Sequence, residues 1–118
     1  MGSGLNALLL TLLLAGPGRA AEGRKPSPAE EAAALFKVGM AAKMKGDTTA
    51  ALDAFTRAMV LNDSLPGASL ARGLTFLDAI MASARFELTT NAERDLVKAV
   101  EDAPRNPLAL SALALIRA

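Results

Sequence analysis

The side chains with the greatest chemical potential in this sequence are carboxylates, which form two adjacent pairs, Glu30-Glu31 and Glu101-Asp102. Paired carboxylates can act as general acid and base. Neither pair has a histidine, a pair of lysines or a glycine-rich loop beside it, and the 118-residue chain contains no histidine and no cysteine. Zinc sites, thiol chemistry and histidine-based catalysis are therefore excluded. We interpret the pairs as solvated surface charge and expect no enzymatic activity, no metal and no cofactor.

Two short motifs also fail to indicate a site. Gly2-Ser3-Gly4 is too short and too close to the N-terminus to form a phosphate-binding loop. Asn62-Asp63-Ser64 fits the N-glycosylation sequon at an exposed turn, and we interpret it as a chance match.

Composition and charge narrow the class of protein further. Basic and acidic residues number 13 and 12, are interleaved, and give a net charge of +1, which argues against binding to nucleic acid or to a membrane surface. Hydrophobic residues make up 52% of the chain and aromatic residues only 3%, with alanine and leucine dominant. This composition is typical of helices. The length allows one modest domain.

Residues 1–20 are predicted to be a signal peptide. Leu5–Ala15 is an uncharged apolar run of the length of a secretory h-region and is too short to span a bilayer. Gly18-Arg19-Ala20 offers small residues for cleavage after Ala20, followed by a flexible leader over residues 21–27. We expect an exported protein, periplasmic or secreted, with no stable membrane span after cleavage. The alternatives are an N-terminal helix packed on the domain, an N-terminal anchor and a mitochondrial presequence.

Capping signals divide residues 28–118 into five helices. Ser27, Pro28 and Glu30 form a capping box with proline at the first helical position. Gly46 ends this helix near Lys45, and Asp47 caps the next. Thr90-Asn91-Ala92-Glu93 reads as a second capping box, and Asn106-Pro107 caps the last helix. The predicted helices cover 28–45, 48–61, 66–87, the stretch from this second box to just before Pro104, and 107 to the C-terminus. Short connections make neighbouring helices antiparallel.

The helices carry an internal repeat. Leu35-x2-Val38-Gly39 precedes Ala51, Phe55 and Ala58, and the spacing of the last three recurs as Ala92, Leu96 and Ala99. This pattern resembles the tetratricopeptide repeat, in which small residues let two helices approach closely. The offset between the two sets is 41 residues, against about 34 in that family. We expect the surplus of seven to lie in the third helix, so that Phe76, Ala79 and Ile80 take the register that Ser69, Arg72 and Gly73 would otherwise hold.

The resemblance implies an all-α, antiparallel helix-hairpin solenoid over residues 28–118, with about two and a half repeats. Members of this family bind protein segments in a concave groove lined by the first helix of each repeat. On this chain the groove positions are Phe36, Met40, Lys43, Met44, Leu74, Leu77, Met81 and Arg85. The implied function is an adaptor that binds an apolar or amphipathic protein segment.

Two further expectations concern the C-terminal end of the repeat. The helix LALSALALIR would begin a third repeat, with Leu110, Leu113 and Ala114 at the first-helix positions. This helix either caps the array or pairs with another chain through Leu108, Leu115 and Ile116, so self-association through it is one of two expectations. The alternative to an adaptor is a structural helical bundle, or the N-terminal fragment of a longer repeat protein, without a binding function of its own.

Overall fold

A computed structural model describes residues 24–118, and this part of the chain is helical without a β-strand. The predicted signal peptide and residues 21–23 of the leader lie outside the described residues. The predicted all-α fold with five helices is confirmed. The helices are α2 (Pro28–Met44), α3 (Thr48–Leu61), α4 (Ala68–Ser83), α5 (Thr89–Asp102) and α6 (Pro107–Arg117), with a short 3₁₀ helix, η1 (Phe86–Leu88), before α5. None of these described helices is long and apolar enough to cross a membrane.

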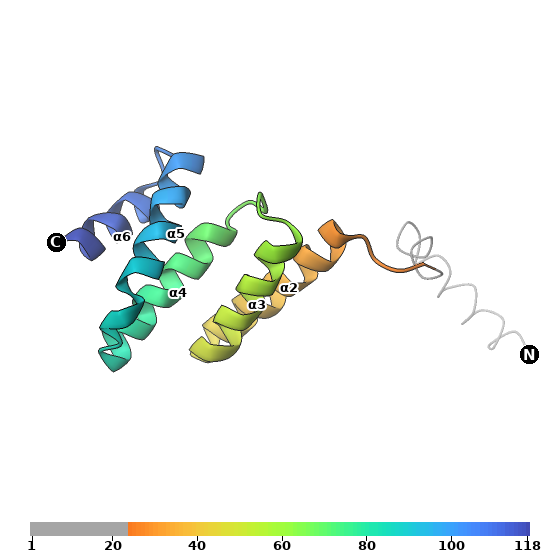
Figure 1. The fold of residues 1–118 in the computed structure, drawn as a ribbon, viewed down its shortest axis with the longest axis horizontal. Helices are drawn as coiled ribbons and strands as arrows, with labels where there is room; N and C mark the ends of the chain where they lie inside the picture. Colours follow the sequence, from red (N-terminus) through yellow and green to blue (C-terminus); the bar gives the residue numbers. More distant parts are fainter. Residues whose placement is uncertain (1–23) are drawn as a thin grey trace, which may run out of the picture.

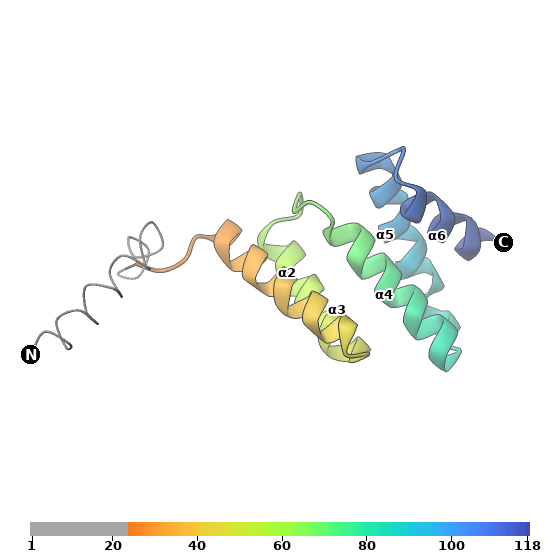
Figure 2. The same ribbon diagram turned by 180° about the vertical axis from the view of Figure 1, so that it is seen from behind.

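The helices form two antiparallel hairpins, α2–α3 and α4–α5, followed by α6 (Figure 1). Seen from behind, α2, α4 and α6 form the nearer layer, and α3 and α5 form the layer beyond it (Figure 2). Contacts agree with this arrangement, because α2 touches α4 and α4 touches α6, whereas α3 and α5 do not touch each other. α4 is therefore the central helix, packed against both helices of the first hairpin, against α5 and against α6.

The ends of the first hairpin agree with the predicted caps. Ser27 Oγ accepts a hydrogen bond from the Glu30 N–H at 3.1 Å, and Glu30 Oε1 accepts one from the Ser27 N–H at 2.8 Å. The bond from the Ser27 N–H is the main reason that the pKa of Glu30 lies below its ordinary value. Gly46 has a φ of +79°, which glycine adopts without a steric cost. Asp47 then accepts from the Ala50 N–H and starts α3.

The predicted ends of the third and fourth helices are wrong. α4 begins at Ala68 and ends at Ser83 rather than near Glu87, because Ala84 takes the left-handed conformation with a φ of +53°. The capping box at Thr90 does not form, since α5 begins at Thr89 directly after η1 and has no side-chain cap. Glu93 instead accepts a hydrogen bond from Arg117 Nε at 2.6 Å.

Ala84→Gly is expected to stabilise the protein by about 1 kcal/mol, because an alanine pays roughly 1–2 kcal/mol for the left-handed conformation and glycine does not. Chemical denaturation followed by circular dichroism measures the change. The matched control is Ala34→Gly, at an exposed position inside α2, which is expected to destabilise by about 1 kcal/mol. Destabilisation by both variants would contradict the assigned turn.

The first hairpin is held by a glycine facing a phenylalanine. A Cβ added at Gly39 would lie 2.6 Å from Cδ1 of Phe55, so only glycine lets the two helices come this close. Phe55 is fully buried, and its ring lies 5.6 Å from that of Phe36 in a tilted arrangement. Ala42, Ala51 and Ala71 complete this core.

The second hairpin repeats this contact with Gly73 and Leu96. A Cβ at Gly73 would lie 2.9 Å from Cδ2 of Leu96, which is also fully buried. Gly73 follows Gly39 by 34 residues, so Gly73 itself holds the first-helix register. The expected shift to Phe76, Ala79 and Ile80 is therefore wrong. The seven surplus residues lie after Gly73: α4 ends ten residues beyond it, whereas α2 ends five beyond Gly39, and the following connection is two residues longer.

Most of the residues expected to pack the repeats are buried. The buried set is Gly39, Ala51, Phe55, Ala58, Ala92, Leu96 and Ala99. Leu35 is half-buried. Val38 differs from the expectation, with 56% of its surface exposed, because the buried stripe of α2 runs through Ala32, Gly39 and Ala42.

A buried ion pair lies within the second hairpin, and its arginine also bonds to the first. Arg72 of α4 donates Nε and Nη2 to the two carboxylate oxygens of Asp95 in α5, at 2.7 and 2.8 Å. Its third nitrogen, Nη1, donates to Thr56 Oγ1 of α3 at 3.3 Å. The guanidinium also lies 5.9 Å from the ring centre of Phe76. Only 4% of the Asp95 side chain and 19% of the Arg72 side chain is exposed, so the pair fixes three helices in one arrangement.

Candidate functional site

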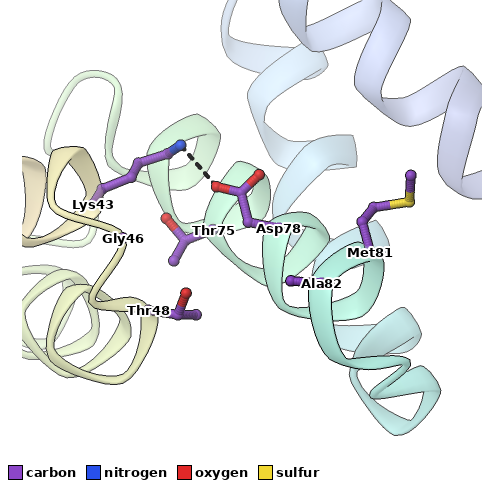
Figure 3. Close-up of a pocket in the computed structure, with 7 residues that line it drawn as sticks. All are labelled: Lys43, Gly46, Thr48, Thr75, Asp78, Met81 and Ala82. Carbon is purple, nitrogen blue, oxygen red and sulfur yellow. Dashed lines mark hydrogen bonds and ion pairs between the residues drawn. The ribbon is translucent and has the colours of Figure 1, made fainter.

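A hollow lies between the two hairpins and is called the interhairpin groove (Figure 3). It has a volume of about 450 Å³. The α2–α3 turn forms one wall, and the C-terminal half of α4 forms the other. The lining residues are Lys43, Gly46, Thr48, Thr75, Asp78, Met81 and Ala82.

An ion pair crosses the rim of this groove. Lys43 Nζ, near the end of α2, lies 3.0 Å from Asp78 Oδ2 on α4 (Figure 3). The Asp78 side chain is 58% exposed, so the attraction is screened and contributes only about 0–1 kcal/mol. Both charges can therefore exchange this contact for one with a ligand. Below them, Thr75 Oγ1 donates to the Ala71 carbonyl at 2.7 Å, which fixes its hydroxyl within the groove wall.

A second hollow, the apolar hollow, lies beside the groove where α4, η1, α5 and α6 meet. Its volume is about 310 Å³. Met81 lines both hollows, and in Figure 3 its side chain points away from Lys43. The side chains of Met81 and Phe86 are each 69% exposed, and Leu115 is 53% exposed. The lining residues are Leu77, Ile80, Met81, Phe86, Thr89, Leu115, Ile116 and Ala118.

The residues expected to line a groove are distributed over several environments. Lys43 and Met81 line the interhairpin groove, and Leu77 and Met81 line the apolar hollow. Leu77 is nevertheless a core residue, buried against Leu96 and Ala112. The remaining positions lie elsewhere: Phe36 and Leu74 pack on the two cores, Met40 and Met44 are exposed, and Arg85 pairs with Glu87 at 3.0 Å.

Sequence reasoning missed Asp78 and Phe86 as parts of the surface, and it assigned Leu115 to a contact with another chain rather than to the groove. Asp78 is placed by its ion pair across the hairpins, which no local pattern reveals. Phe86 lies in η1 because the chain turns at Ala84. Alanine is the strongest helix former, so the sequence around Ala84 predicts a continuous helix and gives no sign of this turn. The apolar exposed side of α6 was the one available signal for Leu115.

The geometry defines a candidate binding surface built on two α-hairpins and a single following helix. A ligand could place an apolar side chain among Met81, Phe86 and Leu115 and a charged or polar group beside Lys43 and Asp78. Comparison of the chain with protein-family models, curated proteins and solved structures found no match.

Proposed function

We propose that this protein is an exported adaptor of the tetratricopeptide type that binds an apolar or amphipathic segment of another protein. The repeat pattern supports the type, because the Gly39–Phe55 and Gly73–Leu96 contacts place equivalent glycines 34 residues apart, close to the family period of about 34. The N-terminal sequence supports export. The observation that carries the binding function is the pair of adjoining hollows that share Met81.

The chemistry of the surface favours a helical segment with one apolar face. Flexible methionine and exposed aromatic side chains adapt to different apolar residues, which suits recognition of a helix face. A bound apolar residue would cover Met81, Phe86 and Leu115, all more than half exposed in the free protein. The neutral Lys43–Asp78 pair can receive either sign of charge from a polar flank of the segment.

Selection of random peptides displayed on phage, with the full chain as bait, tests the proposal. We expect enrichment of peptides with apolar residues at spacings of three and four. Met81→Glu places a charge where the two hollows meet. It is expected to weaken binding of a selected peptide by tenfold or more, which corresponds to a loss of at least about 1.4 kcal/mol. Calorimetric titration measures the affinity.

The matched control is Val60→Glu, which places the same charge on an apolar side chain that is 80% exposed on α3, outside both hollows. It should leave peptide affinity and helix content unchanged. Equal loss of affinity in both variants, or no loss in Met81→Glu, would contradict the assigned surface. Failure to enrich any peptide would favour the purely structural alternative.

A further inference from the structure

Met81 presents an accessible sulfur atom at the point where the interhairpin groove and the apolar hollow adjoin. The residue lines both hollows and is 69% exposed. The chain has five methionines and no cysteine, so its sulfur chemistry is that of thioethers alone. Peroxides oxidise a thioether that they can reach to the sulfoxide, which replaces a flexible apolar side chain with a polar one. Met81 is therefore open to a modification at the centre of the candidate surface.

The apolar hollow has no free side-chain donor for a sulfoxide oxygen. In the part of the chain that the structure describes, Thr89 is the one residue with a polar side chain among those that line this hollow. Thr89 Oγ1 already donates its proton to the Phe86 carbonyl at 2.8 Å. A sulfoxide at Met81 would therefore be hydrogen-bonded to water, and an apolar residue that covered it would remove that water without replacing the bond.

The interhairpin groove does not supply this donor either. Thr75 Oγ1 donates to the Ala71 carbonyl, so its proton is also engaged. Figure 3 shows the Met81 side chain pointing away from Lys43 and Thr48, the two lining residues that could still donate. An oxidised Met81 beneath a bound apolar segment would thus leave a polar oxygen without a partner, which opposes binding.

We propose that oxidation of Met81 to the sulfoxide is a reversible switch that closes the candidate surface to apolar protein segments. This inference rests on the proposed function. A lone pair of the thioether sulfur attacks one oxygen of a peroxide, the O–O bond breaks, and the other oxygen leaves with its proton, as water when the oxidant is hydrogen peroxide. Sulfur loses two electrons and the peroxide gains them. Methionine sulfoxide reductases reverse the change.

Met44 supplies an internal reference for the modification. It is 84% exposed on α2 and lies outside both hollows, so peroxide should oxidise it at least as readily as Met81 without an effect on binding. Met59 is half-buried and should react more slowly. Exposure therefore predicts the order of reaction, and position predicts which sulfoxide weakens binding.

Treatment of the full chain with hydrogen peroxide tests the proposal, with a peptide selected on the untreated chain as the probe. Mass spectrometry locates the sulfoxides, and calorimetric titration measures the affinity. We expect Met81 and Met44 to react before Met59 and the peptide to bind at least tenfold more weakly, a loss of at least about 1.4 kcal/mol. Met44→Leu should lose the same factor on treatment, whereas Met81→Leu should bind equally before and after it. Enzymatic reduction of the sulfoxide should restore the wild-type affinity.

Several results would overturn the switch while the adaptor function stood. These are unchanged affinity once Met81 is oxidised, slower oxidation of Met81 than of Met59, and an equal loss in Met81→Leu, which would assign the effect to another methionine. Loss of helix content in circular dichroism together with loss of affinity would also overturn it, because the oxidised surface must remain folded. Failure of the untreated chain to bind any peptide would instead overturn the proposed function, and the switch with it.

Discussion

Phe55→Ala is expected to reduce the free energy of unfolding by about 3–5 kcal/mol, the range for truncating a buried phenylalanine. The ring is fully buried, contacts Phe36 and closes directly on the backbone at Gly39. Its removal leaves a cavity that these neighbours cannot fill, because Gly39 has no side chain to move into it. Since domains of this size are stable by about 5–15 kcal/mol, the variant is expected to unfold at a markedly lower urea concentration.

Phe86→Ala is the matched control, since it makes the same change at a phenylalanine that is 69% exposed. Its effect on unfolding is expected to stay within about 0.5 kcal/mol. Because Phe86 lines the apolar hollow, this variant should lose peptide affinity without losing stability. Equal destabilisation by the two changes would show that the Gly39–Phe55 contact does not organise the first hairpin.

Asp95→Ala is expected to destabilise the protein by about 3 kcal/mol, because breaking a buried ion pair leaves its partner charge without compensation. The guanidinium of Arg72 would retain Thr56 but lose both bonds to the carboxylate. We place the loss at the lower end of the usual range of about 3–5 kcal/mol, since Arg72 is partly exposed and water can reach it. Urea unfolding measures the change.

The double variant Arg72→Met/Asp95→Leu separates charge from packing. Apolar replacement of a whole buried pair is often neutral or stabilising, so we expect it to recover most of the stability that Asp95→Ala loses. Asp78→Ala removes a carboxylate of the exposed Lys43 pair and is expected to cost no more than about 1 kcal/mol. A large loss in Asp78→Ala, or no recovery in the double variant, would refute this account of the buried pair.

Local capping chemistry made much of the fold predictable. Ser27, Asp47 and Asn106 cap helices as expected, because each side chain bonds to backbone N–H groups within three residues. The prediction fails where tertiary contacts decide. Glu93 forms an ion pair with Arg117 rather than closing a capping box, and Ala84 turns the chain although alanine favours a helix.

The candidate surface was less predictable than the fold because tertiary contacts, rather than local sequence, decide which side chains line it. Transfer of the family pattern identified Lys43 and Met81, which lie near the ends of their helices and face the gap between the hairpins. It also selected Leu77, which the approach of α6 and Leu96 buries. The position of Phe86 depends on where α4 ends, and that end was placed four residues too late, whereas Asp78 is placed by its ion pair with Lys43.

α4 extends further beyond Gly73 than α2 extends beyond Gly39. This extra length separates the residues that line the interhairpin groove from those that pack the hairpins. The surplus residues of α4 follow Gly73 and include Met81 and Ala82. The close contact between Gly73 and Leu96 therefore contains none of the added length. Lengthening α4 after Met81 by a whole turn would therefore extend the interhairpin groove while the Gly39–Phe55 and Gly73–Leu96 contacts kept their geometry. If the groove binds a protein segment as we propose, changes at the exposed Met81 and Ala82 would alter its selectivity without touching the buried Ala79 and Ile80 of the same stretch.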